Sequence, residues 1–188
     1  MSTVQTVTHP ALFMVFFGEI KQESAARIAT TIVNAHNNGY VSMHLMLQSF
    51  GGVIGDCISL HNFFRTVTNI DLTIYNTGAV ESGAVLAYVG AEKRKCSASA
   101  AFIIHRGRNS PQFATADRLQ DIAEALRVDD DRMESILRSR HISLPEDRWA
   151  AFRNGHDVFI TSQEAKAIGL ADEITDFAPT SGSHLVMV

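Results

Sequence analysis

The stretch that decides the fold covers residues 77–107 and is TGAVESGAVLAYVGAEKRKCSASAAFIIHRG. It begins with a turn of small residues around Ser82, which follows a predicted strand over residues 72–75 and precedes a short apolar helix. It ends with a second predicted strand, residues 101–104, that leads directly into His105. A serine at a strand-to-helix turn lies near the positive end of the helix, and a hydroxyl nucleophile needs a base within hydrogen-bond reach. The stretch therefore predicts a catalytic centre built on Ser82 and His105.

The same residues also admit a purely structural interpretation. Small residues around Ser82 permit tight packing of a helix against a strand, and His105 can end a strand with its hydrogen bonds satisfied. Turns of the type Gly-x-x-x-Ser-Gly occur in many α/β folds, so this stretch alone does not decide between the two interpretations.

Composition restricts the class of protein. The chain has 188 residues, of which 46% are hydrophobic and 19% charged, and this fits one soluble globular domain with a sizeable core. We place that domain over residues 12–177, between a flexible N-terminal arm (1–11) and a flexible Ser/Gly-rich tail (178–188). A net charge of −4 gives no reason to expect binding to nucleic acid or to an anionic membrane. The apolar run over residues 12–17 is too short to cross a bilayer, and the N-terminus lacks the basic segment of a signal peptide.

The two cysteines, Cys57 and Cys96, match no metal-ligand spacing. The sequence leaves one disulfide between them open, but two thiols in a chain of this size suit a reducing cytoplasm better. We therefore expect a cytoplasmic protein with neither a metal ion nor another cofactor.

Strands and helices alternate along the first half of the chain. The apolar run over residues 12–17 predicts a strand covered on both faces, and apolar residues at helical spacing follow over residues 25–36. A second strand is predicted over residues 43–47, and the strand–helix–strand order predicts a parallel sheet with a right-handed crossover. Two glycines, Gly51 and Gly52, then leave backbone N–H groups approachable, with a plain tight turn as the alternative.

A long helix is predicted over about residues 114–140. Its apolar positions are Leu119, Ile122, Leu126, Met133, Ile136 and Leu137, and an acidic run over residues 129–131 interrupts it. This apolar stripe exceeds what the core of one small domain needs. We therefore expect the helix to pack on another subunit through Met133 and Ile136, with a solvated amphipathic helix as the alternative.

Four separated motifs resemble one family, the proteolytic subunit of the Clp protease. They are Ser49-Phe50-Gly51-Gly52-Val53-Ile54, Gly78-Ala79-Val80-Glu81-Ser82, Phe102-Ile103-Ile104-His105, and Asp157-Val158-Phe159-Ile160-Thr161 with Glu164-Ala165 and Gly169-Leu170. No single motif is specific, but their order and spacing together are, and the resemblance covers residues 12–174. It implies an α/β, crotonase-like fold, a spiral of ββα units from which a helical handle over about residues 107–140 protrudes.

The resemblance also implies catalytic residues. Ser82 is then the nucleophile, His105 its general base, and Asp157 the carboxylate that orients the imidazole, with Asp172 as an alternative acid. Alignment from the end of the following helix places Glu81 at the nucleophile position instead. Only a serine can perform this chemistry, so we assign Ser82.

The groups that bind the substrate follow from the same resemblance. The backbone N–H groups of Gly52 and Gly83 are then the oxyanion hole. A peptide is expected to lie extended beside Val53 and Ile54 on one side and the segment that contains Arg108 on the other, paired as an added strand.

The implied activity is that of a serine endopeptidase that cleaves peptides or unfolded proteins inside a homo-oligomer of stacked rings. The segment before the first strand is shorter than the one that forms axial-pore loops in the housekeeping enzymes, and Phe50 replaces the proline of the family's Ser-Pro-Gly-Gly motif. Binding of an ATPase unfoldase is therefore left open. Two other functions remain: a non-catalytic ring subunit that assembles with an active paralogue, and a crotonase-like acyl-CoA enzyme with Glu81 as acid or base.

Overall fold

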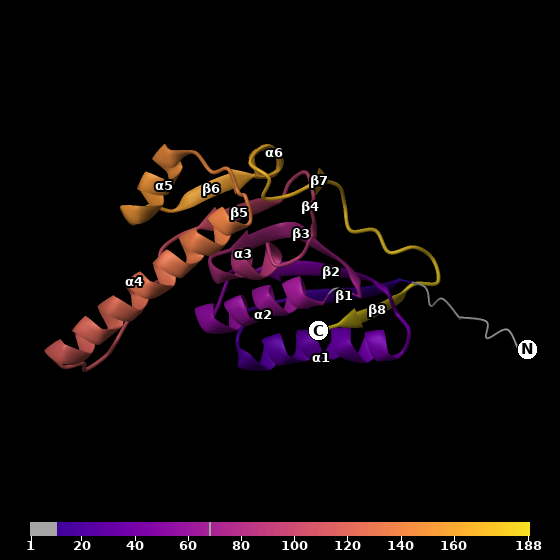
Figure 1. The fold of residues 1–188 in the computed structure, drawn as a ribbon, viewed down its shortest axis with the longest axis horizontal. Coiled ribbons are helices and arrows are strands. Elements are labelled where there is room, and N and C mark those ends of the chain that lie inside the picture. Colours follow the sequence, from indigo (N-terminus) through magenta and orange to yellow (C-terminus); the bar gives the residue numbers. More distant parts are fainter. Residues whose placement is uncertain (1–10, 68) are drawn as a thin grey trace, which may run out of the picture.

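A sheet that is parallel over most of its width forms the centre of the protein in the computed structural model, which describes residues 11–67 and 69–188 (Figure 1). Its strands are β1 (Leu12–Phe17), β2 (Ser42–Ser49), β3 (Asp71–Glu81), β4 (Lys93–Cys96), β5 (Ala101–Ile104), β6 (Val158–Thr161), β7 (Glu173–Ile174) and β8 (His184–Met187). Their order is β6-β5-β3-β2-β1-β8, and β4 joins β3 to β7 at the side. The pairing of β5 with β6 is antiparallel, whereas the pairs formed by β1, β2 and β3 are parallel, as the strand–helix–strand pattern predicts.

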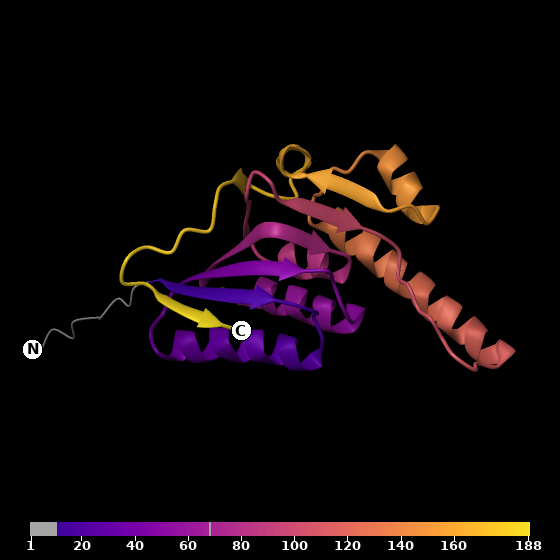
Figure 2. The same cartoon turned by 180° about the vertical axis from the view of Figure 1, so that it is seen from behind.

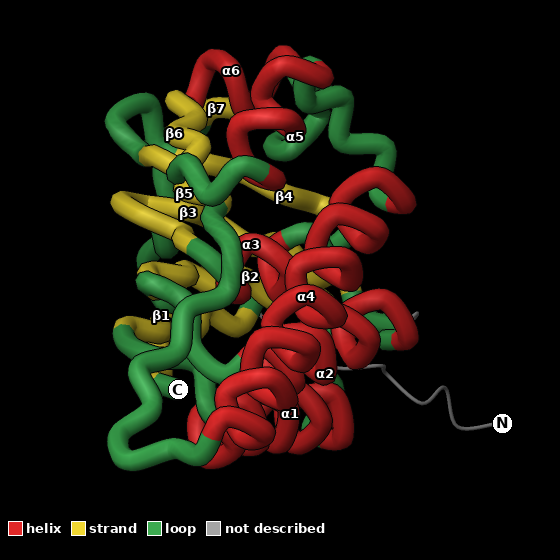
Figure 3. The backbone as a smooth tube through the Cα atoms, turned by 90° about the vertical axis from the view of Figure 1, so that its left-hand side faces the viewer, coloured by secondary structure: helices red, strands yellow, loops and turns green. Residues whose placement is uncertain are grey.

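Helices pack against this sheet, and the first four along the chain cover one of its sides (Figure 3). They are α1 (Gln22–Asn37), α2 (Ile54–Thr66), α3 (Gly83–Tyr88), α4 (Ala116–Ser139), α5 (Glu146–Arg153) and α6 (Ser162–Ala167). Figure 3 shows α1, α2, α3 and α4 together on one side of the strands. Ile28 and Ile32 of α1 are fully buried, as are Met14 and Leu45 of the sheet, so the predicted helical spacing and apolar strand runs meet in one core.

Strand β3 is longer than the sequence predicts. The predicted strand ends at Tyr75, but β3 continues to Glu81 because side-chain amides replace ladder bonds where its register with β2 shifts. Gln48 accepts a hydrogen bond from the N–H of Ala79 at 2.8 Å, and Asn76 donates to the carbonyl oxygen of Ala101 on β5 at 2.8 Å. The strand is therefore long enough to pair with β5 through residues 79–81.

The end of the chain forms an edge strand. Strand β8 pairs in parallel with β1, and the N–H of Val188 donates to the carbonyl oxygen of Val15 at 3.0 Å. This departs from the flexible tail predicted over residues 178–188, because the unpaired edge of β1 offers backbone partners that the Ser/Gly content does not reveal. The predicted arm over residues 1–11 lies, apart from Ala11, outside the described residues.

Helix α4 projects beyond the sheet, and the segment over residues 105–115 runs alongside it to its tip (Figures 1 and 2). Leu119 and Val128 are each 48% exposed, whereas Met133 and Leu137 are buried against the body of the same chain. The expectation that Met133 contacts another subunit is therefore wrong. The exposed apolar positions lie nearer the N-terminal end of the helix.

Phe102 on β5 and Phe159 on β6 provide a matched test of this core. Phe102 is fully buried with its ring centroid 5.0 Å from that of Tyr88, whereas Phe159 is 61% exposed. Because it leaves a cavity, Phe102→Ala is expected to lower the free energy of unfolding by about 3–5 kcal/mol, and Phe159→Ala by much less. Urea denaturation followed by tryptophan fluorescence measures both, and equal losses would contradict the burial described.

Candidate active site

Ser82 occupies a strained turn between β3 and α3. Its backbone has φ 54° and ψ −134°, a conformation that is costly for any residue other than glycine. The turn is held by a hydrogen bond of 2.7 Å from the N–H of Ser82 to the carbonyl oxygen of Ile103 on β5. A strained serine between a strand and a helix presents its hydroxyl at the edge of a sheet. The turn lies where the sequence predicts it, and the role of Ser82 stays a prediction.

The loop of Gly51 and Gly52 lies against Ser82. A Cβ atom on Gly51 would lie 2.7 Å from the Cβ of Ser82, which is closer than real contacts allow. Gly52 forms a parallel bridge with Ile20, in which Ile20 N donates to Gly51 O and Val53 N donates to Ile20 O. Successive N–H groups of an extended chain point to opposite sides, so the bridge does not use the N–H of Gly52.

Gly83 follows Ser82 and packs against Cys57 of α2. It begins α3, so its N–H has no acceptor within the helix. A Cβ atom on Gly83 would lie 2.8 Å from the sulfur of Cys57, so a larger residue at this position would collide with α2. Burial raises the pKa of Cys57 to about 12 and also raises the pKa of Cys96. Both free thiols therefore stay neutral near pH 7 and are poor nucleophiles.

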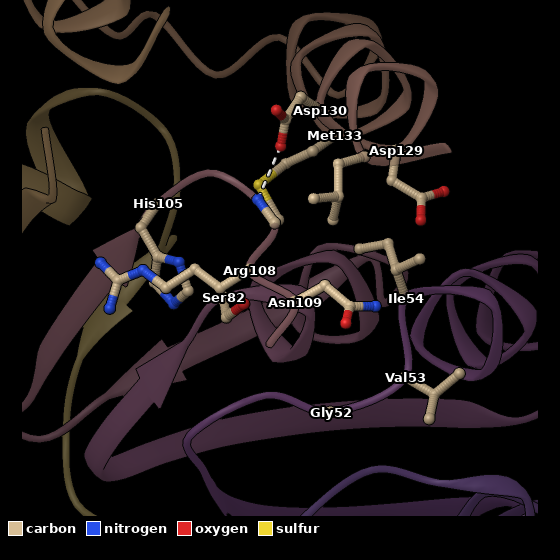
Figure 4. A pocket seen from close by; sticks show the side chains of 12 residues that line it. Gly52, Val53, Ile54, Ser82, His105, Arg108, Asn109, Asp129, Asp130 and Met133 are labelled. Carbon is tan, nitrogen blue, oxygen red and sulfur yellow. Dashed lines mark hydrogen bonds between the residues drawn. The ribbon is translucent and has the colours of Figure 1, made fainter. Parts of the chain in front are cut away.

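Ser82 and His105 line one pocket of about 390 Å³. Its other lining residues are Gly52, Val53, Ile54, Gly107, Arg108, Asn109, Leu126, Asp129, Asp130 and Met133. Figure 4 shows Ser82 and His105 towards one end of the pocket and Ile54 towards the other. The residues predicted to bind substrate, Val53, Ile54 and Arg108, are thus all in its wall. The volume lies within the roughly 300–1,000 Å³ that is usual for ligand sites.

A backbone carbonyl holds the imidazole of His105. Its Nδ1 lies 2.8 Å from the carbonyl oxygen of Arg106. A carbonyl can only accept, so this hydrogen bond places the proton of the neutral ring on Nδ1. Nε2 then has a free lone pair, which is what a general base needs in order to take a proton from a hydroxyl.

Asp157, predicted to orient His105, lies across from it in the strand ladder. Ile104 pairs with Val158, so the next residues outward, His105 and Asp157, are opposite each other where the two strands end. The carboxylate of Asp157 is nevertheless paired with Arg108, with 2.5 Å between Oδ1 and Nη2. The structure brings acid and histidine to neighbouring backbone positions but hydrogen-bonds each side chain to another group.

The alternative acid, Asp172, has a structural role at β4. Its two carboxylate oxygens accept from the backbone N–H of Arg94 at 2.7 Å and from Nη2 of Arg94 at 3.1 Å. The Arg94 side chain is almost fully buried, so the pair holds β4 to the segment that follows α6. These contacts favour Asp157 over Asp172 as the acid of the site.

Asp130 of α4 is a site residue that the sequence does not single out. It is 7% exposed, and it accepts hydrogen bonds from Nε of Arg106 at 2.6 Å and from the N–H of Gly107 at 2.7 Å. Figure 4 marks the second of these bonds with a dashed line. These bonds fasten the segment after His105 to α4. The signal that points to Asp130 is the acidic run 129–131, because charges inside an apolar stripe need partners when the helix packs.

The ionisable side chains that line the pocket are His105, Arg108, Asp129 and Asp130. Within residues 11–67 and 69–188, no group of three or more His, Cys, Asp or Glu side chains is arranged to hold a metal ion. None of the helices in that part of the chain is long and apolar enough to cross a membrane.

Comparison with known proteins identifies the family. The family model described as Clp protease matches residues 4–177. The chain belongs to the Clp protease family. It is 28% identical over 160 residues to the ATP-dependent Clp protease proteolytic subunit 3 of Rhizobium meliloti, a match that covers 84% of this chain and 80% of that protein. A solved structure, a mutant of ClpP1 from Listeria monocytogenes, is similar with a TM-score of 0.74 at 18% identity, over 88% of this chain and 91% of that one.

These findings confirm the resemblance and the fold that the sequence predicts, an α/β Clp protease fold with α4 as its handle. Membership of the Clp protease family also supports a peptidase as the class of activity. The roles of individual residues stay predictions, since a relative of 28% identity does not fix them.

Gly52 can be tested against a nearby glycine. A Cβ at Gly52 would lie 2.0 Å from the carbonyl oxygen of Ile20, and its φ is 154°, so Gly52→Ala is expected to strain the loop by about 1–3 kcal/mol and lower Tm. Gly55 lies in α2 with open space around its Cβ position, so Gly55→Ala is expected to keep or raise Tm. Differential scanning calorimetry compares the two. A Gly52→Ala protein that melts like the wild type would mean that the bridge to Ile20 is wrong.

Proposed function

We propose that this chain is a serine endopeptidase of the Clp proteolytic-subunit type, which cleaves peptides or unfolded proteins. The observation that supports this best is the strained Ser82 turn in the same pocket as His105, whose Nδ1 is bonded to a backbone carbonyl. A hydroxyl that shares a site with an imidazole whose second nitrogen is free is what nucleophilic catalysis requires. Membership of the Clp protease family supports the same proposal.

In the proposed reaction, Oγ of Ser82 attacks the peptide carbonyl carbon while its proton passes to Nε2 of His105. Negative charge develops on the former carbonyl oxygen, and the N–H groups of Gly52 and Gly83 are the proposed donors to it. One such donor is worth about 3–4 kcal/mol of transition-state stabilisation. His105 then gives the proton to the leaving amine, and a water molecule releases the acyl group with His105 again as the base.

Asp157 is the proposed third member of this triad. It lies across from His105 at the ends of β5 and β6, and Asp172 is engaged by Arg94. A carboxylate at Nδ1 stabilises the imidazolium that forms during the reaction better than a neutral carbonyl does. Full activity therefore requires that the carboxylate of Asp157 leave Arg108 and bind the imidazole of His105 instead.

Assembly into a homo-oligomer of stacked rings is proposed from exposed apolar residues on the handle. Leu119 and Val128 of α4 are half exposed, and Phe113, in the segment before α4, is fully exposed. Apolar groups that project from the body of the chain in this way usually mark an interface. The two free buried thiols support a reducing compartment, so we propose a cytoplasmic location.

The nucleophile can be tested with two neighbouring variants. Ser82→Ala is expected to abolish labelling by a fluorophosphonate probe and cleavage of a fluorogenic peptide, because no other hydroxyl replaces Oγ at the turn. Glu81→Gln, one residue earlier on β3, is expected to keep at least half of both activities. If the fluorophosphonate probe does not label the wild-type protein, the result would support the non-catalytic ring subunit. Acyl-CoA turnover that survives Ser82→Ala and is lost in Glu81→Gln would support the crotonase-like enzyme.

The assembly can be tested on the exposed face of α4. Leu119→Asp is expected to break the oligomer into smaller species and to lower peptide turnover with it, because a charge is then buried at the proposed interface. Asp121→Asn, on the same helix, serves as the control. It also changes the charge of the helix by one, but it introduces no charge into the proposed interface. Sedimentation velocity measures the size of each variant. A wild-type chain that is fully active as a monomer would overturn the stacked-ring proposal.

A further inference from the structure

The contacts of Arg108 set it apart from the other charged groups of the pocket. Asp130 is held by Arg106 and by the backbone of the chain, and Asp129 pairs with Arg132 of its own helix at 2.9 Å. Arg108 is the cationic residue that lines the pocket together with Ser82 and His105. Its side chain is 67% exposed, and its ion pair is with the acid that the triad needs.

We infer that Arg108 determines specificity by binding a carboxylate of the substrate peptide, an inference that rests on the proposed endopeptidase function. A guanidinium offers five N–H donors in a planar fork, which matches a carboxylate and is satisfied equally by Asp157 or by a substrate Asp or Glu. An ion pair this exposed is weak because water competes with it, so one carboxylate can replace another at little cost. The substrate class is therefore peptides with an acidic side chain close to the scissile bond.

The exchange has a second consequence for catalysis. When a substrate carboxylate occupies Arg108, Asp157 is released at a position directly across the ladder from His105. Asp157 can then replace the carbonyl of Arg106 as the partner of Nδ1 and complete the triad. An acidic substrate therefore improves kcat as well as KM, whereas a residue that only binds substrate uniformly would change KM alone.

Turnover of paired peptides tests this. One Glu is moved through the positions that flank the scissile bond, and each peptide has a partner with Gln at the same place. Wild-type protein is expected to cleave the best Glu peptide at least about tenfold faster than its Gln partner, the size of effect typical of a hydrogen bond to a charged group. Arg108→Gln is expected to erase this preference and to raise kcat on the Gln peptide, whereas Arg108→Lys keeps part of the preference.

Two controls separate this role from a structural one. Lys93 of β4 forms an exposed ion pair with Asp71 of β3. Lys93→Gln removes this positive charge and is expected to behave as the wild type. The gain of Arg108→Gln on the Gln peptide is expected to vanish when Asp157→Asn is added, because the released carboxylate is then absent. Equal cleavage of Glu and Gln peptides by the wild type, or a preference that survives Arg108→Gln, would overturn the inference.

Binding without chemistry distinguishes this inference from the proposed function. Ser82→Ala protein cannot cleave, and fluorescence anisotropy is expected to show about tenfold tighter binding of the Glu peptide, lost when Arg108→Gln is added. If the wild type neither labels with a fluorophosphonate nor cleaves any peptide, the endopeptidase proposal fails, and this binding measurement still decides on Arg108. If the enzyme is active but Ser82→Ala protein binds both peptides equally, the acidic subsite is wrong and the endopeptidase proposal stands.

Discussion

The pairing of β3 with β5 is the constraint on which the site depends. Glu81 is in register with Ile103, and the next N–H, that of Ser82, donates to the carbonyl oxygen of Ile103. The two strands are parallel, so the residues that leave their carboxyl ends, Ser82 and His105, emerge at the same edge of the sheet. A slip of one residue would turn alternate side chains to the opposite face and separate the pair. The side-chain amide of Asn76, which donates to Ala101, helps to fix this register.

Two ion pairs at the pocket differ in burial, and this difference determines how easily each pair is broken. The Asp130 side chain is 9% exposed, and breaking its pair with Arg106 would leave a buried charge without its cationic partner, which is costly. The pair of Arg108 with Asp157 is far more exposed and is worth about 0–1 kcal/mol. The first pair is therefore part of the fixed framework around the pocket. The second costs little to open, as the proposed exchange of partners requires.

Much of the fold and of the candidate site is predictable from the sequence, because it depends on residues that are adjacent in the chain. A turn of small residues at Ser82, adjacent glycines after β2 and a histidine at the end of β5 are each set by neighbours in the chain. The partner of Asp157 was not predictable, because both Arg108 and His105 can bind its carboxylate. Which of them does so depends on where their side chains lie in the folded chain. Strand β8 was missed for a similar reason, since only the free edge of β1 explains why this tail is ordered. Asp130 left a signal in the acidic run of α4, but its partners lie on a loop whose path the sequence does not give.

The length of β3 has a consequence for how the protein folds. This strand pairs with β2 along its first part, with β4 over residues 73–76 and with β5 over residues 79–81. Each pairing closes a loop between distant parts of the chain, and such non-local parallel contacts form slowly because the loop entropy is lost before the contact is gained. The ladder of β5 and β6 can join the sheet only after β3 is in place. The pocket lined by Ser82 and His105 therefore requires these non-local pairings, and a chain in which β3 and β5 have not yet paired lacks it.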